Sequence, residues 1–326
     1  MNELYPLKFK PIFKDKIWGG DKIQSVMGLD FSPLANCGEA WMLSGVEGSP
    51  SIVTNGFLAG NELNELLEVY MHDLVGDDVY EKFGNEFPVL IKLIDANDWL
   101  SIQVHPDDEL AARRKIGRGK TEMWYVLGAD KNAQLISGFK QKLNKQTYLE
   151  HLQNNTLPEI MNYEKVSEGD VFFMPAGRVH ALGPGVLLAE IQETSDTTYR
   201  IYDWDRTDDE GKSRELHIEE ALDAIDFEVH KKYRTDYLRE EDKSVRLAGC
   251  EHFTTNLISL EKYAIEKDYS TFDSFVSLLC TEGKALIKYN DEQYDINAGE
   301  LILVPASIEN IFISPLQKTK LLEVFM

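Results

Sequence analysis

The pattern of hydrophobic and polar positions predicts a chain built mainly from short β-strands, with helices in only a few segments. Apolar residues recur at helical spacing over residues 62–83, 144–155 and 214–225. Asn144 stands at the start of the second segment, where it suits a helix N-cap. Residues 87–94 and 99–104 are compact apolar runs, which we expect to be adjacent buried strands.

The character of the sequence changes after about residue 235. From there on, short apolar runs alternate with Gly, Asn and Asp turns, which is typical of an all-β domain. The highly charged residues 231–243 predict a connecting arm with a solvated surface. At 326 residues the chain has the length of about two domains. We therefore predict a first domain over residues 1–235, which contains the helical segments, and a smaller, metal-free β domain over residues 236–326.

An internal repeat links the two predicted domains. Residues 169–180 read GDVFFMPAGRVH and residues 299–310 read GELILVPASIEN, so a glycine, an apolar strand, a proline and a short turn follow in the same order. Glycine suits the turn before such a strand, and proline suits its end at an edge. The repeat predicts two β-barrels of the same kind. Asn310 stands where the first copy has His180, which predicts that only the first barrel binds a metal.

Composition narrows the class of partner. The chain has 34 Lys and Arg against 56 Asp and Glu, a net charge of −22, which argues against nucleic acid or an anionic membrane surface. An anionic substrate would need a local basic pocket. No apolar run is long enough to span a membrane, and no signal-peptide pattern occurs. The three cysteines are far apart and unpaired in sequence, so we expect reduced thiols and a cytoplasmic location.

Four side chains form the candidate metal site: Gln103, His105, Glu122 and His180. Gln103 and His105 are two residues apart on a predicted strand and therefore point to the same face. Two imidazoles, a carboxylate and an amide oxygen suit a borderline divalent ion such as zinc. A lone histidine is more often a hydrogen-bonded polar group than a ligand, and Glu122 could simply pair with Lys120 or Arg118. The spacing G-x5-P-x-G-x2-H, which ends at His180, favours the metal site.

That spacing is the second motif of the cupin superfamily, and the surrounding residues narrow the resemblance. Residues 92–108 (KLIDANDWLSIQVHPDD), 119–127 (GKTEMWYVL), 175–182 (PAGRVHAL) and 191–206 (IQETSDTTYRIYDWDR) resemble stretches of the type I phosphomannose isomerases, as do WGG at 18–20 and CGEAWMLSG at 37–45. The resemblance covers residues 10–210 in order and is to the short bacterial form of the family. It implies a mainly β fold of two cupin-type jelly-roll barrels with a few short helices.

The resemblance also implies an activity and a cofactor. A member of this family would be an isomerase that interconverts mannose 6-phosphate and fructose 6-phosphate through an enediol(ate). One zinc ion per chain would be held by Gln103, His105, Glu122 and His180, and the partner would be a small sugar phosphate. The residues alone leave open an iron-dependent cupin oxygenase and a non-catalytic sugar-phosphate-binding cupin. They also leave open whether the protein is a monomer or a homodimer.

The family pattern implies roles for other polar residues. Arg200 and Lys120 match catalytic positions, and Lys92, Ser101 and Lys120 match substrate-binding positions. Lys92 could instead extend from its apolar strand to an edge, although a charge within such a strand is costly unless it points into a polar pocket. Arg200 could instead form an ion pair with one of the aspartates that follow or precede it, at 196, 203 or 205.

The general base and one departure from the family pattern are left open. Lys120 is the first candidate for the base, and Glu193 or Asp203 is the second. Longer members of the family read HKPE where this chain reads GKTE, so Gly119 and Thr121 replace a histidine and a proline. A role held by that histidine in longer members therefore does not transfer to this chain.

Overall fold

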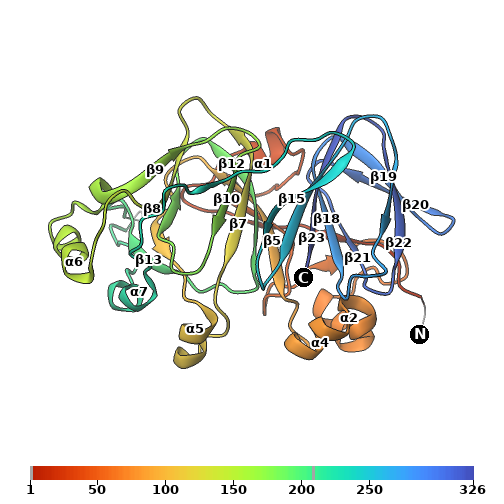
Figure 1. Cartoon of the computed structure of the whole chain (residues 1–326), viewed down its shortest axis with the longest axis horizontal. Coiled ribbons are helices and arrows are strands. Elements are labelled where there is room, and N and C mark those ends of the chain that lie inside the picture. The colour runs from red at the N-terminus through yellow and green to blue at the C-terminus, as the bar shows by residue number, and fades with distance from the viewer. Residues whose placement is uncertain (1–2, 208–209) are drawn as a thin grey trace.

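The computed structural model describes residues 3–207 and 210–326, and its architecture is mainly β with a few short helices (Figure 1). The described strands form four sheets, arranged as a first group of two and a second group of two. No sheet among the described residues closes on itself. The predicted barrels are therefore not confirmed, because in each group the strands divide between two open layers instead of forming one continuous wall.

The first group holds a seven-stranded and a five-stranded sheet. Their strand orders are β14-β10-β7-β12-β5-β3-β2 and β13-β6-β11-β8-β9. The larger sheet contains β2 (Ile12–Lys14), β3 (Glu39–Leu43), β5 (Val89–Ala96), β7 (Glu122–Ala129), β10 (Val171–Met174), β12 (Val186–Glu193) and β14 (Arg234–Thr235). The smaller sheet contains β6 (Ile102–Val104), β8 (Gln134–Phe139), β9 (Met161–Lys165), β11 (His180–Leu182) and β13 (Tyr199–Tyr202).

The second group repeats this plan with a seven-stranded and a four-stranded sheet. Their strand orders are β15-β16-β23-β18-β21-β1-β4 and β17-β22-β19-β20. The larger sheet contains β1 (Leu7–Lys10), β4 (Ile52–Val53), β15 (Lys243–Gly249), β16 (Thr254–Leu260), β18 (Val276–Glu282), β21 (Leu301–Val304) and β23 (Thr319–Phe325). The smaller sheet contains β17 (Ile265–Asp268), β19 (Lys284–Tyr289), β20 (Glu292–Asn297) and β22 (Asn310–Pro315).

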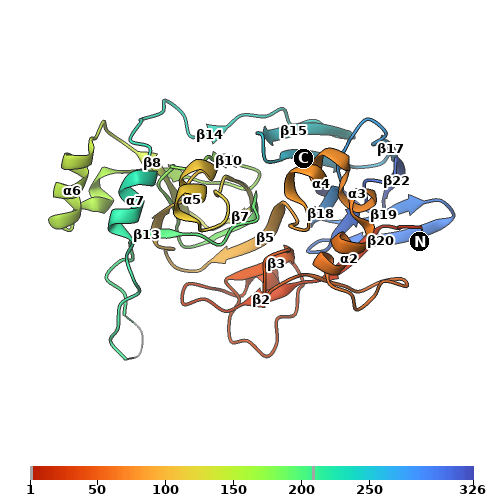
Figure 2. The ribbon, with the colours of Figure 1, turned by 90° about the horizontal axis from the view of Figure 1, so that it is seen from below.

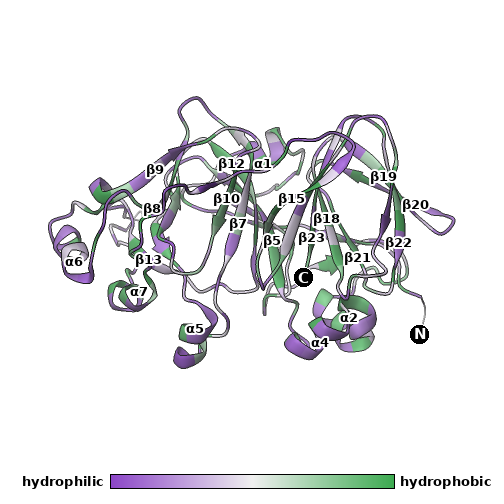
Figure 3. Ribbon diagram, in the orientation of Figure 1, coloured by the Kyte–Doolittle hydropathy of each residue, from purple (hydrophilic) through white to green (hydrophobic). Residues whose placement is uncertain are grey.

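Alternation along the strands explains how the layers pack. In β12, Leu187, Ala189 and Ile191 belong to one hydrophobic cluster and Leu188 belongs to another. The first cluster also contains Leu279 of β18 and other residues of the second group, so the two seven-stranded sheets are joined by a shared core. Separate clusters fill the interior of each group. The strands in the middle of the molecule accordingly carry many hydrophobic residues, whereas the outer loops are largely hydrophilic (Figure 3).

The helices lie close to the predicted segments. Residues 62–83 form α2 (Leu63–Tyr70), α3 (His72–Val75) and α4 (Asp77–Phe83), and the other two segments contain α6 (Lys145–Gln153) and α7 (Ile218–Ala224). The predicted N-cap is confirmed, because the Asn144 side chain accepts a hydrogen bond from the Thr147 backbone N–H. The remaining described helices are α1 (Lys22–Ser25), α5 (Asp108–Arg114) and the short 3-10 helix η1 (Leu157–Ile160).

The view from below shows how the helices lie relative to the sheets (Figure 2). The helices α2, α3 and α4 lie near the second group of strands, and α5, α6 and α7 lie near the first group. Among the described residues, no helix is long and apolar enough to cross a membrane.

Two local predictions need correction. Residues 89–96 and 102–104 are strands, but β5 and β6 lie in different sheets instead of side by side, because the residues between them carry the chain from one layer to the other. Part of the predicted arm over residues 231–243 is also strand. The short β14 pairs with β10, where Thr235 lies opposite Val171. Without β14, β10 would be an open edge of its sheet. The predicted division of the chain at residue 235 stays a prediction. The early strand β1 lies in a sheet of the second group, because it pairs with β21 through Leu7 and Leu303.

Both copies of the internal repeat have the same local structure. Gly169 and Gly299 have φ values of 80° and 83°, which glycine adopts without the steric cost of a Cβ atom. The strands β10 and β21 follow, each in a seven-stranded sheet, and β11 and β22 come after the turn, each in a smaller sheet. His180 begins β11 and Asn310 begins β22. The repeat thus puts these two side chains at equivalent positions in the two groups.

Candidate metal centre and active site

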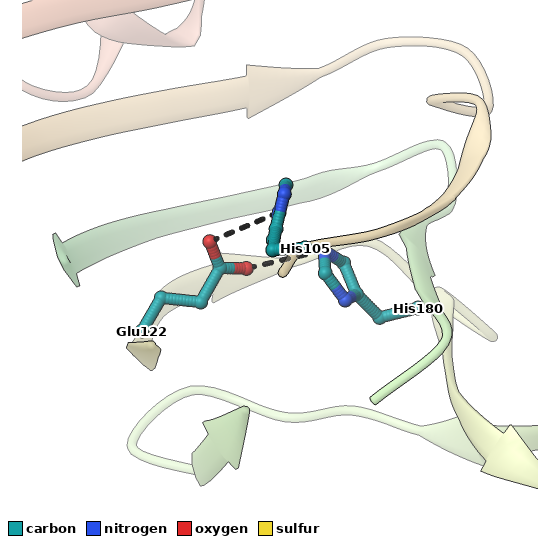
Figure 4. Close-up of side chains that lie close together, drawn as sticks. All are labelled: His105, Glu122 and His180. Atoms are coloured by element: carbon teal, nitrogen blue, oxygen red, sulfur yellow. Dashed lines mark ion pairs between the residues drawn. The ribbon is translucent and has the colours of Figure 1, made fainter. Parts of the chain in front are cut away.

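Three of the four predicted ligands converge at one point in the first group. His105 directly follows β6, Glu122 begins β7 and His180 begins β11, and their ligand atoms all lie within 4.8 Å of one another. Glu122 Oε1 lies 3.2 Å from His180 Nε2, and Glu122 Oε2 lies 3.5 Å from His105 Nε2 (Figure 4). All three side chains are buried. Side chains of these types at these distances could hold a metal ion.

Hydrogen bonds on the far side of each ring orient the two imidazoles. His105 Nδ1 lies 2.9 Å from the Thr197 carbonyl oxygen, and His180 Nδ1 lies 2.8 Å from that of Arg178. A carbonyl oxygen only accepts, so each Nδ1 donates and each Nε2 keeps its lone pair for the centre of the site. Burial lowers the pKa of His180 to about 4 and, with the charge of Lys120, lowers that of His105 well below its ordinary value. Both rings are therefore neutral, as a metal requires.

Glu122 is the group that most needs a partner. It is fully buried, and neither carboxylate oxygen accepts a hydrogen bond from any described residue. Lys120 Nζ lies 3.2 Å from Glu122 Oε2 and 3.2 Å from His105 Nε2. Burial and the charge of Glu190 raise the pKa of Glu122 to about 7. Because a buried carboxylate without hydrogen bonds is costly, a divalent cation between it and two neutral imidazoles fits the site.

Gln103 lies beside these three residues but presents a different atom from the one the prediction requires. It is paired with His180 across β6 and β11, and its Nε2 lies 3.2 Å from His180 Nε2. Ser101 Oγ donates to Gln103 Oε1 at 3.5 Å. The amide oxygen therefore faces Ser101 instead of the imidazole, and the role of Gln103 as a ligand stays a prediction.

A cavity of about 310 Å³ opens onto this cluster, within the size range of small-molecule sites. It collects most of the residues that the sequence singles out, although they come from strands and loops far apart in the chain. Its lining includes Lys92, Ser101, Gln103, Lys120, His180 and Arg200. The cavity therefore combines candidate ligands with several cations inside a strongly acidic protein.

Lys92 points into this cavity and not toward a sheet edge. Its Nζ donates to Gln192 Oε1 at 2.6 Å and to Glu190 Oε1 at 3.1 Å. Burial disfavours the charge of Lys92, but Glu190 and Glu39 outweigh that effect and raise its pKa. Burial likewise disfavours the charge of Glu190, yet Lys92 and Lys120 outweigh it and lower the pKa of Glu190 to about 2. Lys92 and Glu190 therefore form a lasting ion pair in the cavity wall.

Arg200, in β13, retains an unused donor. Its Nη1 donates to the Glu215 carbonyl oxygen at 2.8 Å, whereas its buried Nε has no hydrogen-bond partner among the described residues. Asp203, one of the expected ion-pair partners, is instead bound by Arg206 and Arg214. Burial and the charge of Arg214 lower the pKa of Arg200. A guanidinium held among other cations, with a free N–H group, suits an anionic ligand.

The two second-choice bases do not line the cavity. Glu193 lies 3.0 Å from His252 Nδ1 and accepts a hydrogen bond of 2.6 Å from the Thr121 backbone N–H. Asp203 is bound by two arginines. Lys120 lines the cavity, so the geometry favours it over the other two candidates.

Main-chain packing explains why residue 119 is a glycine. A Cβ atom at Gly119 would lie 2.5 Å from the backbone nitrogen of Asp108 and 2.7 Å from the backbone carbon of Asp107. These residues begin α5, and the Asp107 side chain caps it by accepting from the Leu110 backbone N–H. A histidine at residue 119 would require a backbone shift, which accounts for the departure from the HKPE pattern.

The sequence does not by itself identify Glu39, Glu190 and Arg214, which also line the cavity. Glu190 does have a local signal, because Glu190 and Gln192 alternate with apolar residues along β12 and must share a face. Trp124 Nε1 donates to Glu190 Oε2 at 2.9 Å on that face. Arg214 has no comparable signal, because a loop returns it to the cavity after the end of β13.

A larger cavity, of about 660 Å³, lies in the second group beside β20. Its lining includes the carboxylates of Glu3, Asp291, Glu292 and Asp295, together with Lys8. Lys8 is already paired with Asp295 at 2.9 Å. This cavity would repel an anion, so the smaller one is the better candidate for a phosphorylated substrate.

Comparisons with protein families match two separate parts of the chain. The family described as phosphomannose isomerase type I, catalytic domain, matches residues 6–147. The family described as mannose-6-phosphate isomerase, cupin domain, matches residues 243–319. The candidate ligands at 103, 105 and 122 lie within the first match.

Individual relatives match over most of the chain. Mannose-6-phosphate isomerase ManA of Bacillus subtilis is 35% identical over 306 residues, or 92% of this chain and 93% of that protein. Mannose-6-phosphate isomerase of Streptococcus mutans is 33% identical over 309 residues, or 94% of each chain. A crystal structure of the mannose 6-phosphate isomerase from Bacillus subtilis matches with a TM-score of 0.88 at 31% identity, over 98% of this chain and 99% of that chain. The chain therefore belongs to the mannose-6-phosphate isomerase family of type I phosphomannose isomerases, and it is an isomerase.

Proposed function

We propose that the protein is a zinc-dependent enzyme that interconverts mannose 6-phosphate and fructose 6-phosphate through an enediol(ate). The observation that carries this proposal is the buried Glu122 carboxylate, whose two oxygens lack hydrogen bonds and face the Nε2 atoms of His105 and His180. The cavity beside it also contains cations for a phosphorylated sugar. The names of the relatives supply the substrate.

The proposed ligands are Gln103, His105, Glu122 and His180, with one zinc ion per chain. Two neutral imidazoles and a carboxylate are donors that zinc accepts, and each imidazole is oriented by a backbone carbonyl. Gln103 joins them when its amide oxygen is turned toward His180. When bound, zinc would supply a Lewis acid that polarises the substrate oxygens.

The reaction moves protons and needs no external oxidant or reductant. A base removes the proton from C2 of mannose 6-phosphate, the electron pair forms the C1–C2 double bond, and O1 gains negative charge. A proton is then added at C1, the proton of O2 passes to O1, and C2 becomes the carbonyl carbon. We assign the base to Lys120, because its Nζ lies in the cavity next to the candidate ligands.

Arg200, Lys92 and Ser101 bind and orient the substrate together with Lys120. Arg200 stabilises the charge that develops on the oxygens, since its Nε is not used by the described protein groups. Lys92, Ser101 and Lys120 bind the sugar phosphate. Because Lys92 is paired with Glu190, it contributes directed hydrogen bonds more than free positive charge.

Coupled turnover of mannose 6-phosphate to fructose 6-phosphate tests the proposal. Activity should disappear after chelation and return when zinc is restored. Unphosphorylated mannose should react poorly under the same conditions, because it lacks the group that the cations bind. An inactive zinc-loaded protein would contradict the proposal. Iron content with oxygen uptake would then indicate the oxygenase, and sugar-phosphate binding without turnover would indicate the non-catalytic protein.

We also propose that each group of sheets is a cupin-type jelly roll and that the chain divides near residue 235, with β1 added to the second unit. The shared spacing of the repeat supports the first point, and the family match that begins at residue 243 supports the second. Limited proteolysis between residues 231 and 243 tests the division. A cytoplasmic location and the choice between monomer and homodimer stay predictions.

A further inference from the structure

A tight turn of the second group of sheets contacts the first group. The turn joins β15 to β16 and is closed by the Cys250 backbone N–H, which donates to the Phe253 carbonyl oxygen at 2.9 Å. His252 lies within this turn, with its side chain 14% exposed, and its Nδ1 lies 3.0 Å from Glu193 Oε1. Glu193 is the last residue of β12, in the first group, and is buried.

Glu193 in turn holds the backbone of the segment that carries Lys120 and Glu122. The Thr121 N–H donates to Glu193 Oε2 at 2.6 Å, and the Glu193 N–H donates to the Thr121 carbonyl oxygen at 3.1 Å. Both sides of the Thr121 main chain are therefore fixed by one residue. Since Thr121 lies between Lys120 and Glu122, any movement of Glu193 changes where both of those side chains point.

His252 and Glu193 do not line the cavity, so they affect a reaction there only through the residues they hold. The Lys120 N–H donates to the Pro106 carbonyl oxygen at 3.0 Å, which fixes the other side of the same segment. Without His252, the Glu193 carboxylate would lose the partner of one oxygen and be free to rotate away from Thr121.

We propose that His252 is a positioning residue that, through Glu193, holds the segment of Lys120 and Glu122 in its working geometry. The second group of sheets thereby contributes to a site that it does not line. This inference rests on the proposed function, because it takes Lys120 as base and Glu122 as ligand.

Asp108, Glu193 and His252 also lie close enough together to hold a cation. However, both oxygens of Glu193 already have protein partners, and Asp108 Oδ1 accepts from the Gly119 backbone N–H at 2.8 Å. The cluster is therefore satisfied by the protein itself, in contrast to Glu122. Metal content per chain separates a positioning residue from a metal ligand here.

The test compares His252→Ala and His252→Asn with a matched control, His72→Asn, which changes an exposed histidine on α3. For zinc-loaded proteins, kcat and KM for mannose 6-phosphate and the rate of zinc loss to a chelator are measured. We expect His252→Ala to lower kcat about tenfold to a hundredfold, the usual cost of losing a residue that supports a metal site. KM should change by less than about threefold, because no substrate contact is removed. Zinc should be lost faster.

Rescue distinguishes positioning from general destabilisation. The amide nitrogen of His252→Asn can replace Nδ1 as donor to Glu193, so this variant should regain most of the lost kcat, and His72→Asn should match the parent protein. Unchanged kcat and zinc loss in His252→Ala would overturn the proposal, as would a metal content that falls from two ions per chain to one. If His252→Ala does not fold, Glu193→Gln tests the same connection, and parent-like kcat and zinc loss in that variant would overturn it. Failure of the proposed function is distinguishable, because the zinc-loaded parent protein would then be inactive.

Discussion

The two copies of the repeat show how one β scaffold can carry a candidate metal site in one group of sheets and a hydrophobic cluster at the same position in the other. In the first group, β10 pairs with β7 so that Met174 lies opposite Glu122. In the second, β21 pairs with β18 so that Val304 lies opposite Val276. Met174 and Val304 each precede the proline of the repeat, so Val276 takes the position of Glu122.

The same register compares the other candidate ligands. His180 lies opposite Gln103, and Asn310 lies opposite Asp268, which makes Asp268 the counterpart of Gln103. The position two residues further on is His105 in the first group and Ser270 in the second. Asp268 accepts hydrogen bonds from Ser270, so that pair is satisfied without a ligand.

The change at Asn310 is only one of several differences between the two copies. Val276 is buried in the hydrophobic cluster that fills the second group. A buried carboxylate of this group, Glu323, is already bound by Lys267 and Tyr269. The backbone positions are retained in the second group, whereas the side-chain chemistry is replaced.

The largest expected effect follows from removing a ligand from the first copy. His180→Ala should lose zinc and reduce kcat by about a thousandfold, because a Lewis acid supplies several kcal/mol of transition-state stabilisation and each 1.4 kcal/mol is about tenfold. Asn310→Ala is the matched change in the second copy and should leave zinc content and kcat unchanged. Metal analysis and steady-state kinetics check both. Metal that followed Asn310 instead would reverse the assignment of the two copies.

Exchanging the equivalent residues at the start of β7 and β18 should affect stability to different extents. Val276→Glu buries an unpaired carboxylate and should lower the free energy of unfolding by about 3 kcal/mol. Glu122→Val should lower that of the metal-free protein by less, about 1 kcal/mol, because it removes the carboxylate that lies 3.2 Å from the buried Lys120 but leaves the charge of Glu190 near that lysine. Zinc binding is lost. Urea denaturation of the metal-free proteins checks both values. Equal destabilisation by the two changes would contradict the view that residue 122 lies in a polar site and residue 276 in a hydrophobic core.

The strand register identifies no cationic counterpart of Arg200 among the described residues of the second copy. Removing Arg200 should lower kcat and leave the metal content unchanged. Arg200→Ala should lower kcat by about a hundredfold, as expected when a donor to a developing oxyanion is lost. Zinc content should stay that of the parent protein. Kinetics combined with metal analysis separates this result from that of His180→Ala. Parent-like kcat would remove Arg200 from the mechanism.

The smallest expected effect concerns the contact between the two groups and depends on pH. The hydrogen bond between His252 and Glu193, with smaller contributions from the charges of Asp108 and Glu251, raises the pKa of His252 above its usual 6.5. A raised pKa in the folded state means that the stabilisation is complete below pH 6.5 and is lost as the pH rises through the raised value. The parent protein should thus exceed His252→Asn in free energy of unfolding by less than about 1 kcal/mol at pH 6, and by less still at pH 9. A difference that grew with pH would contradict the ion pair.

Local patterns predict the helices well, because their periodicity and caps are properties of adjacent residues. Asn144 shows this, since its cap is visible in the sequence and present in the structure. The layer assignment of β5 and β6 cannot be predicted in the same way, because it depends on partners far away in the chain, such as Glu190 opposite Lys92. Sheet order is decided by these distant pairings.

The candidate site follows a similar division. Spacing and family resemblance point to His105, Glu122 and His180, and the structure brings their ligand atoms together. The ion pair of Lys92 with Glu190 could not be inferred, because nothing local indicates that β5 and β12 are neighbours. The amide orientation of Gln103 is equally inaccessible to sequence, since it depends on side-chain neighbours in a different strand.

The pairing of β1 with β21 has a consequence for the time course of biosynthesis. Leu7 and Lys8 lie opposite Leu303 and Ile302, so one edge of β1 has to wait for a strand that the ribosome makes much later. Contacts this distant in sequence form slowly. The strands β5, β7 and β12 can meet much earlier. A nascent chain would therefore assemble the strands of the candidate site while one edge of β1, which contains the apolar Leu7 and Phe9, still lacks β21 as its partner, and this edge is a natural target for chaperones.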